Sequence, residues 1–84
     1  MGKVNTFFDK SWGIVLKEMR KSKGKGWSQR YVCEKIGTSH VTISNLERGI
    51  EPVKQTDLYA LLSCYGYNFH QFVTWLSEVQ KRQK

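Results

Sequence analysis

Residues 40–48 carry short polar side chains on one side of an expected helix, and these side chains suit hydrogen bonding to DNA bases. Apolar Ile43 and Leu46 lie three positions apart, so they share one face of a helix that turns about 100° per residue. An Asn amide on the other face can form two hydrogen bonds to adenine, and a Val side chain can contact a thymine methyl group. The candidate base-contacting residues on and beside that face are His40, Val41, Thr42, Ser44 and Asn45.

Three of these candidates leave a second role open. Thr42 and Ser44 could pack against neighbours or contact phosphate, and His40 could donate to a purine N7 or to a phosphate. A helix that is merely solvated would more often carry Glu and Lys on this face. The composition therefore favours contact with a nucleic acid in the major groove.

The segment before residue 40 is expected to position this face. Residues 29–36 predict a short helix with Val32, Cys33 and Ile36 on one side, and Gly37 suits a left-handed helix end. Helices this short are unstable alone in water, so they must pack on the rest of the chain. The sequence thus predicts a helix-turn-helix over about residues 29–48.

The rest of the chain shows further helical patterns and no strand pattern. Gly66 and Pro52 mark expected breaks, and Ser28 is a good N-cap. We expect an all-α, compact five-helix fold forming a single domain over residues 1–84. The expected helices cover about residues 6–21, 29–36, 40–48, 55–65 and 69–81.

The last expected helix, 69–81, has more apolar surface than one small core needs. Its apolar residues span about 160°, against roughly 100° for an ordinary amphipathic helix. We expect Phe69, Val73 and Leu76 to face the core, which leaves a second apolar edge for a homodimer. In the alternative, Phe7 covers this edge within one monomer. The residues expected at the dimer interface are Phe72, Trp75 and Val79.

Composition and charge indicate the class of partner. The chain has 84 residues, a formal net charge of +7 and a pI of about 9.7, which favours a polyanionic partner, although solubility alone is the plainer explanation. Cys33 and Cys64 fall on apolar stripes, so we expect reduced thiols and a cytoplasmic protein. No nucleophile–base set, carboxylate pair, metal-ligand spacing or membrane-length apolar run is present. We therefore expect no enzyme activity, cofactor, metal, membrane or small-molecule ligand.

The ordered set of residues in the central segment resembles the lambda-repressor-like (Cro/XRE) helix-turn-helix family. The resemblance extends from about Trp12 to Gly66 and implies a lambda-repressor-like fold that binds double-stranded DNA. The matching positions are Ser28-Gln29, Cys33, Gly37, Ser39, Ile43, Ser44 and Glu47-Arg48-Gly49.

The resemblance also implies roles for single residues. Arg20 and Glu47 correspond to a structural ion pair between the first and third helices, and Gln29 to a phosphate ligand. The loop over residues 21–26 is about two residues longer than usual in the family, and it could be an inert turn or a basic finger along the DNA backbone. The candidate phosphate-contacting residues are Gln29, Arg30, Lys23, Lys25, Arg48 and Lys54.

Together these features predict a sequence-specific DNA-binding transcription regulator. We expect a repressor or autoregulator that binds a pseudo-palindromic operator as a homodimer. An antitoxin-type module that binds a partner protein is the main alternative, because the wide apolar face of 69–81 could receive one. Non-specific binding to RNA or to bulk DNA is a third interpretation.

Overall fold

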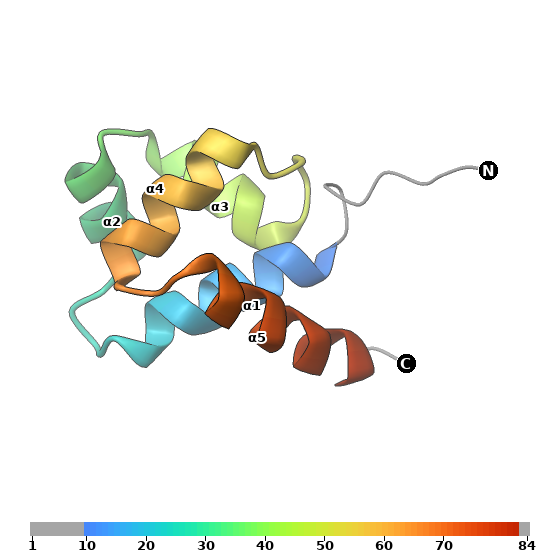
Figure 1. The fold of residues 1–84 in the computed structure, drawn as a ribbon. Helices are drawn as coiled ribbons and strands as arrows, with labels where there is room; N and C mark the ends of the chain where they lie inside the picture. The colour runs from blue at the N-terminus through green and yellow to red at the C-terminus, as the bar shows by residue number, and fades with distance from the viewer. Residues whose placement is uncertain (1–9, 83–84) are drawn as a thin grey trace.

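The computed structural model describes residues 10–82, which form five α-helices without a strand in that range (Figure 1). The expected all-α, five-helix fold is confirmed. The expected bounds of the middle three helices are reproduced, and the first turn predicted for helix 6–21, with Phe7, lies outside the described residues. The helices are α1 (Lys10–Ser22), α2 (Gln29–Ile36), α3 (His40–Arg48), α4 (Gln55–Tyr65) and α5 (Phe69–Arg82).

Local hydrogen bonds define the turn between α2 and α3. Ser28 caps α2 by accepting from the Tyr31 N–H at 3.1 Å, and Ser39 caps α3 in the same way from Thr42. Gly37 ends α2 in the left-handed conformation, with φ of 75°, and donates to the Cys33 carbonyl at 2.9 Å. The turn geometry therefore follows from the residue types at its two caps.

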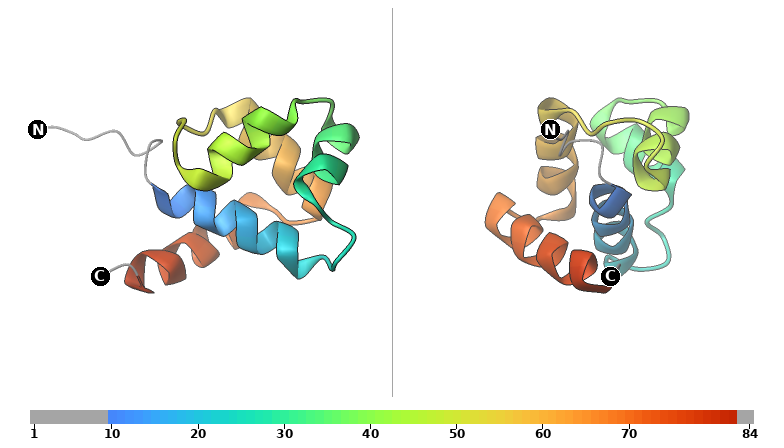
Figure 2. Two further views of the ribbon diagram at one scale, coloured as in Figure 1. Left: turned by 180° about the vertical axis from the view of Figure 1, so that it is seen from behind. Right: turned by 90° about the vertical axis from the view of Figure 1, so that its right-hand side faces the viewer.

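Helix α1 lies between α3 on one side and α5 on the other (Figure 2). The contact with α3 is close at Gly13, where an added Cβ would lie 2.3 Å from the Leu46 carbonyl oxygen. Only a residue without a side chain permits this approach of the two backbones. The core around α1 includes Val15, Leu16, Met19, Val32, Ile43, Leu46, Leu58, Leu61, Leu62 and Tyr65.

The predicted orientation of α5 is wrong. Phe72 and Val79, expected at a dimer interface, are buried in the monomer core at 0% and 1% exposure. Phe69 and Val73, expected in the core, are 48% and 44% exposed. The Phe72 ring packs edge-to-face on Trp12, with ring centroids 5.2 Å apart, so the fit against α1 decides which part of the wide apolar arc is buried.

Trp75, the third residue expected at the interface, is half-buried against the core. Its indole Nε1–H donates to Glu18 Oε1 across 2.9 Å, which satisfies the only polar group of the side chain. Trp75 thus joins α5 to α1 through its indole N–H, while part of its ring stays at the surface.

Candidate DNA-binding surface

The α3 face predicted to contact bases is directed away from the core. Val41 is 65% exposed, and His40 and Arg48 are also exposed. Ser44 and Asn45 are half-buried, while Ile43 and Leu46 point inward. Figure 2, left, views the molecule from the side on which α3 lies in front of α4. The structure therefore brings these candidate residues to one face of one helix.

Two candidates on this face already have partners within the chain. The Thr42 hydroxyl lies 2.9 Å from that of Ser39, so Thr42 takes part in the helix cap. The Asn45 Nδ2 donates to Glu51 Oε2 at 3.0 Å. Glu51 was not among the predicted site residues, although it belongs to the loop that directly follows α3.

A buried polar network joins α3 to α1 and α2. Arg20 Nε donates to Glu47 Oε2 at 2.7 Å and Arg20 Nη2 to Glu47 Oε1 at 3.0 Å, so the predicted pair exists and is bidentate. Arg20 Nη1 also donates to the Trp27 carbonyl at 2.8 Å. The hydrogen bonds with Glu47 raise the pKa of Arg20. The network keeps the orientation of α3 relative to α1.

Gln29, a predicted phosphate ligand, is also tied to this network. Its Nε2 donates to Glu47 Oε1 across 2.9 Å, and the residue is half-buried at the first position of α2. One N–H and the carbonyl oxygen of the amide are left for a further ligand. The backbone N–H groups at the same helix start favour an anion. Two further phosphate candidates, Arg30 and Lys54, are exposed.

The two lysines of the longer loop are in different surroundings. Lys23 Nζ lies over the rings of Trp27 and Tyr67, 5.9 and 5.7 Å from their centroids. Lys25 is exposed and helps to line an open hollow of about 410 Å³ between the end of α1 and the start of α2. The loop therefore packs through Lys23 and offers Lys25 to solvent.

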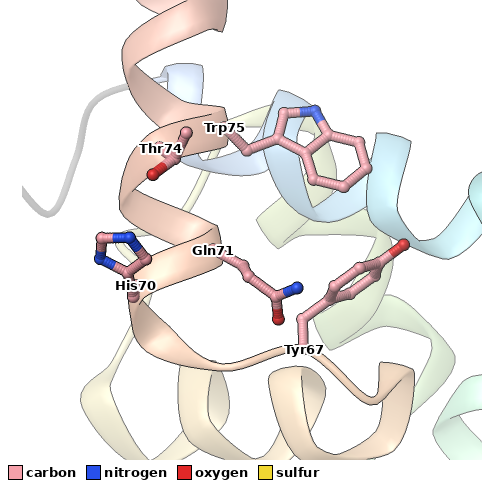
Figure 3. A pocket seen from close by; sticks show the side chains of 5 residues that line it. All are labelled: Tyr67, His70, Gln71, Thr74 and Trp75. Carbon is pink, nitrogen blue, oxygen red and sulfur yellow. The ribbon is translucent and has the colours of Figure 1, made fainter.

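A second open depression, of about 450 Å³, lies on α5 and the segment before it, apart from the α3 face. In Figure 3, His70 and Thr74 project from one side of α5, whereas Tyr67 and Trp75 lie on the other with Gln71 between. The Tyr67 and Trp75 rings pack edge-to-face, with centroids 5.5 Å apart. This depression has a mixed aromatic and polar lining and contributes no residue to the α3 face.

Comparison with known proteins identifies the family to which this fold belongs. A family model described as helix-turn-helix, of the Cro/C1 (XRE-like) type, matches residues 16–72, which include the whole of α2, α3 and α4. Searches of curated proteins and of solved structures found no match. Within residues 10–82, no helix is long and apolar enough to cross a bilayer. The chain therefore belongs to the helix-turn-helix family of DNA-binding transcription regulators.

Proposed function

We propose that the α3 face reads bases in the major groove of a specific double-stranded DNA site. The observation that carries this proposal is the outward face of α3. Its side chains are short and mostly uncharged, and the Arg20–Glu47 pair holds the helix in place. A fixed helix with donor and acceptor side chains can distinguish base pairs by their edges. The proposed readers are His40, Val41, Thr42, Ser44 and Asn45.

Positively charged and amide side chains around this face would hold the DNA backbone. Such contacts set position without reading sequence, and they make binding depend on salt. The formal net charge of +7 supports this role. Because Lys23 packs on two rings, Lys25 is the stronger candidate within the loop. The proposed set is Gln29, Arg30, Lys23, Lys25, Arg48 and Lys54.

Selection of bound sequences from a random DNA pool tests this function. We expect an enriched motif and, for a dimer that neutralises about six to ten phosphates, a log–log salt slope of about −5 to −9. Asn45→Ala should cost about 1–3 kcal/mol at one base position, whereas Gln29→Ala should weaken all sequences alike. Equal affinity for selected and random DNA would contradict sequence-specific binding.

The repressor or autoregulator would act as a homodimer on a pseudo-palindromic operator. The proposed surface is the uncharged patch of Tyr59, Phe69 and Val73, in which the Tyr59 and Phe69 rings have centroids 6.3 Å apart. A second copy is the favoured occupant, because a two-fold interface is self-complementary and a pseudo-palindromic operator requires two recognition helices about one DNA turn apart.

The same apolar patch supports the alternative of an antitoxin-type module that binds another protein. Sedimentation of the purified chain and of Val73→Glu separates the two. We expect a dimer at micromolar concentration for the wild type and a monomer for the variant. A wild type that stays monomeric, yet binds a co-expressed small protein through this patch, would favour the alternative.

A further inference from the structure

The loop after α3 places one carboxylate directly against the α3 face. Glu51 Oε2 accepts a hydrogen bond from Asn45 Nδ2 at 3.0 Å, and Glu51 is exposed while Asn45 is half-buried. An acidic side chain beside a DNA-binding face repels phosphate, so its presence there costs affinity.

The backbone around Glu51 is well defined by its neighbours. Gly49 ends α3 with φ of 73°, and the Ile50 N–H donates to the Asn45 carbonyl at 3.0 Å, which turns the chain back over the last turn of α3. Pro52 follows directly and disfavours a helical backbone conformation at Glu51. Val53 is buried in the core and anchors the other end. The loop therefore holds the backbone of Glu51 beside the last turn of α3, where its carboxylate reaches Asn45.

The chemistry of the contact defines the orientation of the Asn45 amide. A carboxylate only accepts hydrogen bonds, so the amide nitrogen and not the amide oxygen must face Glu51. This leaves the oxygen and the second N–H of the planar amide for another partner. One acceptor and one donor in this fixed order match the N6–H and N7 of adenine, and an amide rotated by 180° would present them in the opposite order.

We propose that Glu51 is a positioning residue that fixes the Asn45 amide and thereby determines which base pair α3 prefers at that position. This inference rests on the proposed base-reading function and deepens it. Glu51 acts through Asn45 and would lower affinity for DNA in general while raising discrimination at one base pair. Discrimination and overall affinity should thus change in opposite directions when the charge is removed.

The test compares the wild type with Glu51→Gln, Asn45→Ala and the double variant, each as the full chain, on selected DNA and on every single-base change of it. A glutamine at position 51 can donate or accept and so releases the amide orientation. We expect Glu51→Gln to lose about 2- to 10-fold discrimination at one position and Asn45→Ala about 5- to 150-fold at the same position. In discrimination at that position the double variant should resemble Asn45→Ala, because Glu51 acts there only through Asn45.

Glu78→Gln is the matched control, since it removes the same charge from an exposed site on α5. It should leave discrimination unchanged. A second readout needs no DNA: the side-chain NH₂ resonances of Asn45 in an NMR spectrum should shift in Glu51→Gln and Glu51→Ala but not in Glu78→Gln. Unchanged thermal unfolding of the Glu51 variants would show that they fold.

The possible failures are distinguishable. A wild type that prefers no sequence overturns the base-reading function and this inference with it. If the wild type selects a motif that depends on Asn45, but Glu51→Gln leaves the profile unchanged, only the inference fails. Asn45 resonances that do not respond to either Glu51 substitution would also overturn it, because the contact would then be absent in solution.

Discussion

One ion pair joins helix α1 to α3 and another joins it to α5, and the two pairs differ mainly in burial. Arg20 Nε lies 2.7 Å from Glu47 Oε2 on the α3 side, with side chains only 9% and 3% exposed. Arg82 Nη2 lies 2.9 Å from Glu18 Oε1 on the α5 side, with side chains 59% and 32% exposed. Similar distances therefore occur in very different dielectric surroundings.

The distance between two charged groups does not by itself determine how much their ion pair contributes to stability. A buried charge that loses its partner stays desolvated, whereas an exposed one is solvated again at once. On the α3 side, Gln29 and the Trp27 carbonyl complete the hydrogen bonds of the pair. On the α5 side, buried Phe72 and Val79 supply the packing and the ion pair is secondary. We expect polar substitutions to affect α3 and apolar truncations to affect α5.

Glu47→Ala should have the largest combined effect, on stability and on DNA binding. It leaves the Arg20 guanidinium buried without its partner, and we expect a loss of about 3–5 kcal/mol in the free energy of unfolding, measured in urea. DNA binding should fall as well, because the orientation of α3 depends on the pair. The control is Arg20→Met with Glu47→Leu, which should be less destabilised than Glu47→Ala. A single variant as stable as the wild type would contradict the importance of the buried network.

Phe72→Ala tests the α5 side and the corrected orientation of that helix. Removing a fully buried ring should cost about 3–5 kcal/mol of unfolding free energy. Val73→Ala, one position away but 44% exposed, should change the monomer by less than about 0.5 kcal/mol. Chemical denaturation at low protein concentration measures both. Equal losses in the two variants would mean that α5 has no single buried face.

Gly13→Ala should have an intermediate effect by separating α1 from α3. The new Cβ would lie 2.3 Å from the Leu46 carbonyl oxygen, so the helices must move apart at a cost of about 1–3 kcal/mol. Gly26→Ala is the control, since no heavy atom lies within 4 Å of an added Cβ there. Thermal unfolding compares the two, and a fully stable Gly13→Ala would argue against this close contact.

Glu18→Gln should have the smallest effect, less than about 1 kcal/mol, because solvent screens the exposed pair. Hydrogen bonds from Arg82, and then from Trp75, lower the pKa of Glu18. Because the pKa is lowered by folding, the ionised carboxylate stabilises the folded state at pH values above the ordinary carboxyl pKa. This stabilisation is lost as the pH falls through the pKa that Glu18 has in the folded protein. The difference from wild type should therefore shrink as pH falls below the ordinary carboxyl pKa, vanish only below the lowered folded value, and also shrink in 1 M salt. A difference that persists in acid would assign the effect to packing.

Much of the fold could be predicted from the sequence because its signals are local. Ser28, Ser39, Gly37 and Gly66 determine helix ends through hydrogen bonds and backbone conformations that involve only nearby residues. The resemblance also pointed to the Arg20–Glu47 pair, although 27 positions separate the two residues. The base-contacting and phosphate-contacting residues remain predictions.

The tertiary structure decided what these local signals leave open. The apolar arc of α5 was wide enough for two orientations, and only the fit of Phe72 on Trp12 and of Trp75 on Glu18 selects one of them. Lys23 likewise packs over the ring of Tyr67, which lies far from the loop in the sequence. Helix ends depend on neighbours within one turn of the chain, whereas the buried face of a helix depends on the shape of partners that are distant in sequence.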